Sequence, residues 1–275
     1  MAGILYVVAT PIGNLEDVTL RALKVLRDVS IVAAEDTRRT ARLLQHYSIP
    51  TPTTSLHEHN ERQKAPKLIE RLLAGDSIAL VSDAGTPVVS DPGQALIAAA
   101  RDAGVRVESI PGASAVMAAV AASGLDTREF TFLGFPPNRS IDRKKWLAAA
   151  AAQPRLVVFF EAPHRILGML TDLSAVAGGD RVVGLARELT KTHEELVIQP
   201  IHVLLARFKE PRGEFTVLLP PATHAGAERE SIDPETIARE FGELTNNGRL
   251  KRREALKVLA ERYGVAVNAL YKLLG

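Results

Sequence analysis

Cysteine is absent from this 275-residue chain, which rules out disulfides, thiolate metal ligands and a cysteine nucleophile. Aromatic residues make up only 5% of the sequence, so aliphatic residues and alanine must build most of the core. No apolar run approaches the roughly 20 residues needed to cross a bilayer. The N-terminal segment also lacks the basic stretch of a signal peptide. We therefore expect a cytoplasmic protein with no membrane partner.

Two familiar phosphate-binding loops are also missing. No Gly-x-Gly-x-x-Gly follows an expected strand, which argues against an ordinary dinucleotide-binding or Rossmann-type methyltransferase loop. No Gly-Lys-Ser/Thr is present, which weakens any assignment as a nucleoside triphosphatase. The formal net charge of +2 neither demands nor excludes nucleic acid, because the clustering of charge decides such binding.

What the sequence does contain is an alternation of short aliphatic strands and amphipathic helices. This alternation predicts a mostly parallel sheet covered by helices on both faces. The expected strands of the first part are Leu5–Ala9, Ser30–Ala34, Ser77–Ser82 and Val105–Ile110. The expected helices between them are Leu20–Leu26, Arg39–His46, Ala65–Leu73 and Ala95–Ala103.

A second α/β domain is expected after Pro111-Gly112-Ala113-Ser114, a turn that opens an alanine-rich helix running through Ala122. Its strands and helices point to more antiparallel pairing, and the third and fourth strands are candidates for a hairpin. We predict domains at 1–114 and 115–221, with a helical extension at 228–275. The expected elements are strands Phe130–Phe135, Arg155–Phe160, Val182–Leu189, Glu194–Ile198 and Phe215–Leu219, helices from Asp142 and from Pro163, and tail helices Pro234–Leu244, Lys251–Tyr263 and Val267–Leu273.

Four loops at the expected carboxyl ends of strands are candidate ligand sites, because open α/β sheets bind ligands at that edge. They are 9–15, 34–40, 81–93 and 110–114. The loop 81–93 is the strongest candidate, because its Gly85 allows close approach of a ligand to the backbone. Each loop also has a purely structural interpretation. Asp36 or Thr37 is a natural helix cap, as is Asp91 with Pro92 at the first position of the helix.

Several of these segments resemble the motifs of the tetrapyrrole methylase superfamily. Thr10-Pro11-Ile12-Gly13-Asn14, Asp83-Ala84-Gly85-Thr86-Pro87 through Asp91-Pro92-Gly93, and Pro111-Gly112-Ala113-Ser114 carry this resemblance. Further segments are similar to the branch that methylates a ribose 2′-hydroxyl of small-subunit ribosomal RNA: Glu35-Asp36-Thr37-Arg38, Phe160-Glu161-Ala162-Pro163-His164-Arg165, Ala186-Arg187-Glu188-Leu189-Thr190-Lys191 and Gly213-Glu214-Phe215. The central loop departs from the Gly-Asp-Pro common among tetrapyrrole-modifying relatives, which puts a porphyrin-like substrate in doubt.

The resemblance implies two α/β domains with S-adenosylmethionine in the cleft between them, and a homodimer. It implies a methyltransferase that modifies the 2′-hydroxyl of a cytidine in the decoding region of 16S ribosomal RNA within the small ribosomal subunit. By the family pattern, the cofactor-binding residues are Thr10, Pro11, Asp83, Ala84, Gly85, Thr86, Pro87, Val88, Ser90, Pro111, Gly112, Ala113, Ser114, Ala115, Phe160, Glu161, Gly213, Glu214 and Phe215.

Catalysis on a ribose hydroxyl benefits from a base and from cations near the oxygen. We expect Glu35 or Asp36 to act as the base or substrate anchor, and Arg38, Arg187 and Lys191 to contact phosphate or polarise the oxygen. Glu161 and His164 are second choices for this chemistry. Caps and ion pairs within a domain are the structural alternative for every one of these residues.

Two basic clusters are candidate RNA-binding surfaces: Arg139, Arg143, Lys144 and Lys145 beside Trp146, and Arg249, Lys251, Arg252 and Arg253 in the tail. Trp146 could stack on a base or anchor the core, and the tail cluster could be an ordinary solvated helix face. His57, Glu58, His59 and Glu61 lie close together, but we expect a polar loop there and no metal site. Two competing functions remain open: methylation of a small molecule such as a tetrapyrrole, and a non-catalytic RNA-binding assembly factor.

Overall fold

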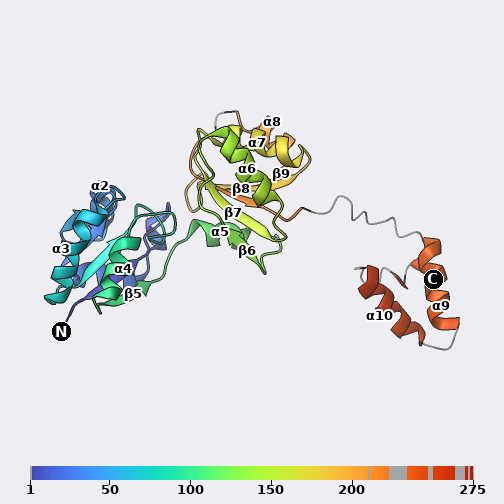
Figure 1. Ribbon diagram of the computed structural model, residues 1–275, viewed down its shortest axis with the longest axis horizontal. Coiled ribbons are helices and arrows are strands. Elements are labelled where there is room, and N and C mark those ends of the chain that lie inside the picture. Colours follow the sequence, from blue (N-terminus) through green and yellow to red (C-terminus); the bar gives the residue numbers. More distant parts are fainter. Residues whose placement is uncertain are drawn as a thin grey trace. The chain divides into compact units, whose positions relative to one another are not determined.

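The computed structural model describes residues 2–209, 211–222, 234–246, 250–263, 270–271 and 273–274. The chain forms two compact units, Met1–Ala222 and Thr223–Gly275. The larger unit holds two five-stranded sheets, each with its own helices (Figure 1).

The first sheet is entirely parallel and has the strand order β3-β2-β4-β1-β5. Its strands are β1 (Ile4–Val8), β2 (Ile31–Ala34), β3 (Thr53–Ser55), β4 (Ile78–Val81) and β5 (Arg106–Ile110). Its helices are α1 (Leu20–Asp28), α2 (Thr37–His46), α3 (Glu61–Leu73) and α4 (Gln94–Asp102), with a single 3₁₀ turn at Leu15–Asp17. The predicted parallel sheet is thus confirmed. The strand β3 was not predicted, since its residues Thr53, Thr54 and Ser55 carry no aliphatic signal.

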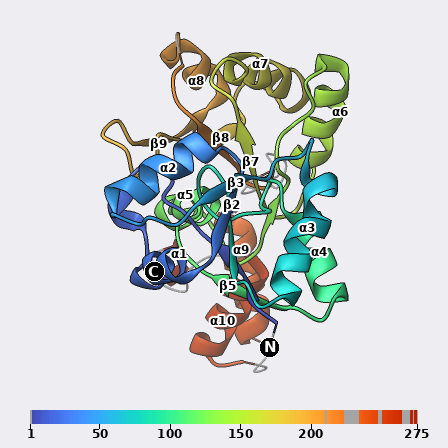
Figure 2. The same ribbon diagram turned by 90° about the vertical axis from the view of Figure 1, so that its left-hand side faces the viewer.

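The side chains of the first sheet pack into two separate cores, because successive residues of a strand point to opposite faces of the sheet. Val32 and Ala34 of β2 pack with α1 and α2, whereas Ala33 between them packs with α3 and α4. Figure 2 shows α2 and the α3–α4 pair on opposite sides of the sheet. Burial on both faces explains why the central strands β2 and β4 are continuous apolar runs. Because the strands are parallel, the carboxyl ends of β1, β2 and β4 lie at one shared edge.

The second sheet has the order β6-β7-β10-β8-β9, with β6 parallel to β7 and the other pairs antiparallel. The expected antiparallel character and the β8–β9 hairpin are confirmed. Its strands are β6 (Phe130–Phe132), β7 (Leu156–Glu161), β8 (Val182–Arg187), β9 (Glu195–Pro200) and β10 (Phe215–Leu219). Its helices are α5 (Ala115–Ala122), α6 (Ser140–Ala151), α7 (Ile166–Ala177) and α8 (Ile201–Arg207), of which α8 was not predicted.

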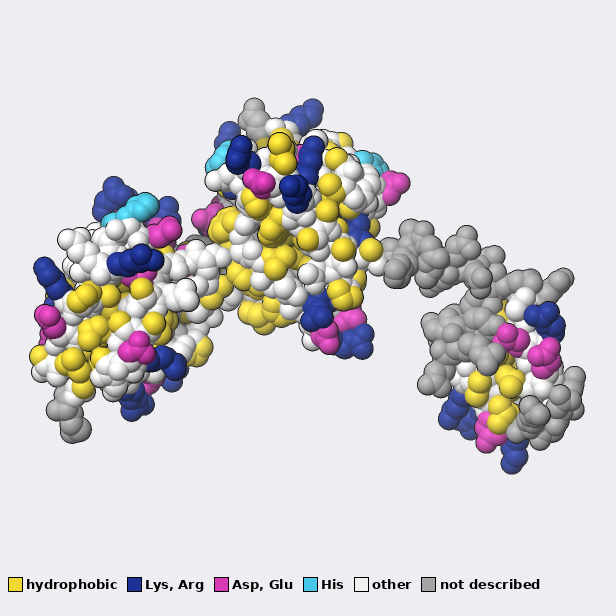
Figure 3. All heavy atoms as spheres, in the orientation of Figure 1, with side chains coloured by type: hydrophobic (Ala, Val, Ile, Leu, Met, Phe, Trp, Pro, Cys, Tyr) yellow, Lys and Arg dark blue, Asp and Glu magenta, His cyan; other side chains and the backbone are white. Residues whose placement is uncertain are grey.

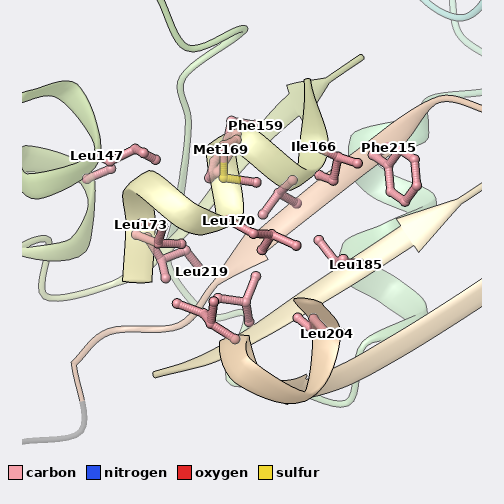
Figure 4. Packing of buried hydrophobic residues seen from close by; sticks show 14 of the residues in the cluster. Leu147, Phe159, Ile166, Met169, Leu170, Leu173, Leu185, Leu204, Phe215 and Leu219 are labelled. Carbon is pink, nitrogen blue, oxygen red and sulfur yellow. The ribbon is translucent and has the colours of Figure 1, made fainter. Parts of the chain in front are cut away.

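Helices α6, α7 and α8 cover one face of this sheet and α5 covers the other (Figure 1). Figure 4 shows the larger core, where Phe159 of β7 lies among Met169 and Leu170 of α7. The ring of Trp146 contacts Phe159 edge to face, with centroids 5.2 Å apart. Trp146 is therefore a core anchor, and the stacking role considered for it is not supported.

Two predicted helix-start residues are wrong. Helix α4 begins at Gln94, close to the expected Ala95, but its cap is Gly93, with a φ of 124°, so Asp91 and Pro92 lie in the preceding loop. Helix α7 begins at Ile166, and Pro163 belongs to the turn before it. In both places a loop that lines a cavity replaces the first helical turn expected from the proline.

The smaller unit contains α9 (Pro234–Asn246) and α10 (Arg252–Tyr263), close to the predicted bounds. Ile237, Leu256, Leu259 and Leu270 form its core. Most of the predicted helix Val267–Leu273 and the expected cap Asp233 lie outside the described residues. The boundary predicted between residues 114 and 115 stays a prediction.

Candidate functional site

A cavity of about 430 Å³ lies at the carboxyl edge of the first sheet and is closed by residues of the second sheet. Such an edge is where open α/β sheets bind ligands. The lining residues are Ile12, Glu35, Arg39, Asp83, Ala84, Gly85, Thr86, Val89, Ser90, Asp91, Ser114, Ala115, Val116, Phe135, Phe160, Glu161, Ala162, Pro163, Glu188, Leu189, Lys191, Glu214, Phe215 and Thr216.

The loops after β1 and β4 are joined by backbone hydrogen bonds. The amide of Thr10 donates to the Gly85 carbonyl over 2.8 Å, and the amide of Gly85 returns a bond of 2.9 Å to the Thr10 carbonyl. Gly85 has a φ of 82°, and a Cβ there would lie 3.3 Å from Ile12. The Thr86 hydroxyl donates to the Ala113 carbonyl over 3.3 Å. Three of the four predicted loops therefore form one connected wall.

The loops around the cavity hold most of the backbone strain in the described residues. Val88 and Ser90 in the central loop have φ values of 74° and 70°. Glu188 and Thr190, after β8, have φ values of 49° and 68°. A positive φ is unfavourable for these side chains, above all for the β-branched valine and threonine. Such strain persists where the surrounding structure enforces it and is typical of ligand sites.

The second sheet contributes an aromatic wall and a polar turn. Phe160 contacts both Phe132 and Phe135, with ring centroids 5.0 Å and 5.4 Å away. The Lys191 ammonium lies 2.8 Å from the Glu188 carboxylate. The turn that carries Lys191 packs against the first loop so closely that a Cβ on Gly13 would lie 2.9 Å from the Leu189 carbonyl oxygen.

Three carboxylates of the first sheet share the cavity. The Glu35 carboxylate accepts from the Asp83 amide over 3.4 Å, and the Asp83 carboxylate accepts from the Asp36 amide over 2.9 Å. Burial raises the pKa of Glu35, and the nearby Asp83 carboxylate adds to that effect. Burial also raises the pKa of Asp91 to about 6, with repulsion from Glu35 as the next contribution. The site thus holds two carboxyl groups whose pKa is raised mainly by burial, and that of Asp91 reaches about 6.

Glu161 is a fourth acidic group and is almost fully buried. One of its carboxylate oxygens accepts from the Ala162 amide over 2.8 Å and lies 3.0 Å from the Arg165 guanidinium. The other oxygen, Oε2, has no hydrogen-bond partner among the residues that the structure describes. Burial raises the pKa of Glu161, although the Ala162 amide and Arg165 oppose the effect. An unsatisfied buried oxygen at a cavity wall is available to a donor on a ligand.

The predicted cofactor-binding residues divide into two groups. Those that line the cavity are Asp83, Ala84, Gly85, Thr86, Ser90, Ser114, Ala115, Phe160, Glu161, Glu214 and Phe215. Those that do not are Thr10, Pro11, Pro87, Val88, Pro111, Gly112, Ala113 and Gly213. Thr10 and Pro11 instead line a neighbouring cavity of about 150 Å³.

The predicted catalytic residues divide in the same way. Glu35 and Lys191 line the cavity. Asp36 caps α2 by accepting from the Arg38 amide over 2.8 Å, and its other oxygen pairs with the Arg38 guanidinium at 2.8 Å. Arg187 pairs with Glu195 at 2.6 Å. The structural interpretation thus applies to Asp36, Arg38 and Arg187 in this conformation. His164 is exposed and does not line the cavity.

Sequence reasoning missed several lining residues. Arg39, Phe135 and Leu189 were passed over as site residues, and Asp91 was considered only as a helix cap. Arg39 follows the predicted Arg38 directly, and its guanidinium lies 3.4 Å from Asp83. Arg39 lines the cavity, whereas Arg38 does not.

Ion pairs and ring contacts involve several residues of the two basic clusters. Arg143 is largely buried and pairs with Asp172 at 2.6 Å, and Lys144 lies 3.6 Å from the same carboxylate. In the tail, Arg252 lies over the rings of Phe241 and Tyr271, at 5.8 Å and 5.9 Å, and Arg249 is outside the described residues. Of the first cluster, Arg139, at the start of α6, and Lys144 and Lys145, within it, are exposed cations.

The His57–Glu61 segment is held by local hydrogen bonds. Asn60 contacts the His57 ring over 2.9 Å, and the Glu61 carboxylate accepts from the Leu96 amide over 3.0 Å. Across the residues with described positions, no group of three or more His, Cys, Asp or Glu is arranged to hold a metal ion. In that same part of the chain, no helix is long and apolar enough to span a bilayer.

Comparison with known proteins decides the family. The model of the family described as Tetrapyrrole (Corrin/Porphyrin) Methylases matches residues 4–204. The chain belongs to this methylase family. It is 47% identical to a protein named ribosomal RNA small subunit methyltransferase I from Vibrio cholerae, over 98% of this chain and 94% of the relative. Proteins of the same name from Synechocystis and Escherichia coli O157:H7 are 45% and 46% identical over 98% of this chain, covering 97% and 94% of their own lengths.

Solved structures share the fold at lower identity. A diphthine synthase aligns with a TM-score of 0.63 at 17% identity, covering 80% of this chain and 90% of that one. The methyltransferase CobJ aligns with a TM-score of 0.62 at 21% identity, covering 80% and 95%. The expected α/β fold of tetrapyrrole methylase type and the methyltransferase class are confirmed. Family membership also supports S-adenosylmethionine as the methyl donor.

Proposed function

We propose that this methyltransferase acts on ribosomal RNA of the small subunit and methylates the ribose 2′-hydroxyl of a cytidine in the decoding region. The names of the relatives, which match over nearly the full chain, support ribosomal RNA as the substrate class. The observation that carries the proposal is a half-buried glutamate, Glu35, in a cavity suited to a cationic cofactor.

The cavity fits S-adenosylmethionine in charge and shape. Six carboxylates line it, against the two cations Arg39 and Lys191. This excess of negative charge favours a ligand with a sulfonium and an ammonium and disfavours a phosphorylated one. Apolar groups such as Val116, Phe135 and Phe160 offer a wall for an adenine ring. When bound, S-adenosylmethionine supplies an electrophilic methyl group on a positively charged sulfur.

Glu35 is the better placed of the two candidate bases. Its carboxylate lines the cavity, and burial brings its pKa closer to neutrality, which suits a group that accepts a proton near pH 7. The pairing with Arg38 lowers the pKa of Asp36 to about 2, which makes Asp36 a weak base. We therefore assign to Glu35 the acceptance of the ribose hydroxyl proton, and to Asp36 the capping of α2.

Lys191 is the best placed of the three proposed cations. Its ammonium lies at the cavity wall beside Glu188, within reach of an oxygen that develops negative charge. Arg38 and Arg187 would first have to leave their pairs with Asp36 and Glu195. The structure thus favours Lys191 for stabilising the oxygen.

Asp91 is expected to make cofactor affinity depend on pH. Below its pKa of about 6 the cavity loses one negative charge, so affinity for a cationic ligand should fall as pH drops from 7 to 5. A screened unit charge contributes about 1 kcal/mol, or roughly fivefold in Kd. In Asp91→Asn the affinity should be lower at pH 7 and this dependence should be weaker. Calorimetric titration with S-adenosylmethionine at several pH values measures both.

Asp91 should also limit stability. A carboxyl whose pKa is higher in the folded than in the unfolded state stabilises the fold below its usual pKa of 3.8, and this contribution is lost as pH rises to about 6. Asp91→Asn should therefore raise the free energy of unfolding at pH 7 by on the order of 1 kcal/mol, since water screens the half-exposed group. Urea titration at pH 4 and pH 7 measures the difference, and an equal effect at both pH values would contradict the assignment.

The experiment that tests the proposed function is transfer of a radiolabelled methyl group to small ribosomal subunits that lack their own modification, with mapping of the labelled nucleotide. Label on the ribose of a decoding-region cytidine is the expected result. Label on another RNA position would overturn the site but keep the substrate class. No label on naked RNA, assembly intermediates or mature subunits, despite cofactor binding, would favour a small-molecule substrate. Failure to bind the cofactor would favour a non-catalytic assembly factor.

The homodimer belongs to the same proposal. Sedimentation of the purified chain at micromolar concentration should give twice the 29.7 kDa mass of one chain. A monomeric mass in the presence and absence of cofactor would contradict it.

A further inference from the structure

Helix α2 presents a face of arginines at the mouth of the candidate site. Arg39 and Arg42 are both exposed, and the helix Thr37–His46 contains no acidic residue. Figure 3 shows Lys and Arg side chains on the surface at the place that α2 occupies in Figure 1. The two arginines are three residues apart, so they lie on one side of the helix about 4.5 Å apart along its axis.

A small cavity connects these arginines to the larger one. It has a volume of about 150 Å³ and is lined by Arg39 and Arg42 together with Thr10, Ser82 and Asp83. Arg39 and Asp83 line both cavities. A strand that inserted one nucleotide into the larger cavity would therefore pass its neighbouring phosphate over the smaller one.

The three arginines of α2 differ in whether an acidic side chain already neutralises their charge. Arg38 is paired with Asp36 at 2.8 Å, and Arg39 lies 3.4 Å from Asp83. Arg42 has no ion pair or side-chain hydrogen bond with any residue in the described part of the chain. An exposed, unpaired guanidinium beside a cavity is suited to bidentate binding of a phosphate.

On this basis, and resting on the proposed function, we propose that Arg42, together with Arg39, binds the phosphodiester next to the nucleotide that enters the cavity. The site recognises the RNA backbone and carries no base specificity, because phosphate contacts position a strand without reading its sequence. It places positive charge directly at the mouth of the cavity, where Arg39 and Arg42 line the smaller cavity.

The test compares the full-length chain with its Arg42→Gln variant on unmodified small ribosomal subunits. The variant should raise the KM for subunits and their equilibrium Kd about five- to tenfold, with kcat and the Kd for S-adenosylmethionine unchanged. Loss of one phosphate contact should also reduce the slope of log Kd against log salt by about 0.7 to 0.9.

Arg101→Gln is the matched control. Arg101 is an exposed arginine in the last turn of α4, and that end of the helix leads back to the amino edge of the sheet. The Arg101→Gln variant should leave the KM for subunits and the slope of log Kd against log salt unchanged. If Arg42→Gln bound subunits with the Kd and salt slope of the wild type, and the wild type transferred methyl groups normally, this proposal would be overturned. The proposed function would still stand. Weaker subunit binding with an unchanged salt slope would overturn the phosphate assignment. A wild type that neither binds nor labels any ribosomal RNA would overturn both.

Discussion

Replacing Glu35 with glutamine is expected to lower kcat for methyl transfer by about 10²- to 10⁴-fold, the usual contribution of a general base. Glutamine keeps the size of the side chain and removes the carboxylate that lines the cavity. The affinity for S-adenosylmethionine should change by less than about tenfold, because five other carboxylates remain in the lining. Single-turnover transfer to small ribosomal subunits separates the chemical step from binding.

The pH dependence of the wild type provides a second readout for Glu35. The rate should rise with pH through the raised pKa of Glu35, because only the ionised carboxylate accepts a proton. This rise should be missing in Glu35→Gln. The comparison variant is Asp36→Asn, which keeps an oxygen to cap α2, removes the charge that pairs with Arg38 and should reduce kcat far less. A larger loss of kcat in Asp36→Asn than in Glu35→Gln would transfer the role of base to Asp36.

Replacing Gly13 with alanine is expected to lower kcat/KM by about 100-fold, because a displacement of about 1 Å at an active site can have an effect of this size. The new Cβ would lie 2.4 Å from Lys191 Cγ and 2.9 Å from the Leu189 carbonyl oxygen. The first contact can be relieved by a side-chain rotation, whereas the second requires backbone movement. The loop with Ile12 must therefore move away from the turn with Leu189 and Lys191, and all three residues line the cavity.

The control for Gly13 is a glycine-to-alanine change with room for the methyl group. Gly168 lies inside α7, where the nearest atom to a new Cβ is Arg143 Nη2 at 3.6 Å. Gly168→Ala should leave kcat/KM unchanged and stabilise the fold by about 0.5–1 kcal/mol, because alanine has the higher helix propensity. For both variants, steady-state kinetics measures kcat/KM and urea titration measures the free energy of unfolding. Normal activity in Gly13→Ala would show that the two loops are not held together by this contact.

Combining Gly13→Ala with Lys191→Ala tells the two contacts apart. The lysine change removes the contact at 2.4 Å and leaves the one with the Leu189 carbonyl. The backbone displacement should also lower the affinity of Gly13→Ala for S-adenosylmethionine, and this affinity should stay reduced in the double variant. Full recovery of that affinity would mean that the side chain alone caused the loss.

The sequence by itself determined four of the five strands of the first sheet and their parallel arrangement. The strands β1, β2 and β4 are aliphatic runs that stand out from the amphipathic helices between them. The loops follow from that order, because carboxyl ends of parallel strands share an edge. This is why Glu35, Asp83 and Gly85 could be assigned to one site from the sequence.

Local signals failed where packing against the other sheet sets the conformation. Pro92 and Pro163 are both plausible first residues of a helix, yet the loops around them line the cavity and the helices begin later. Strand β3 has no aliphatic residue and forms through pairing with β2 at the edge of the sheet and hydrogen bonds from Lys64 of α3. Propensity describes a segment in isolation, and contacts from distant residues override it.

Only the tertiary structure decided which charged residues are available for chemistry. Arg38, Arg39 and Arg42 are alike in the sequence, but one pairs with its own helix cap, one lies beside Asp83, and the third is unpaired among the residues described. Likewise Arg143 is largely buried against Asp172, and the carboxyl of Asp91 has a pKa of about 6. Burial and the distance to an opposite charge determine these differences. Both depend on residues that are far apart along the chain, so they arise only when the chain folds.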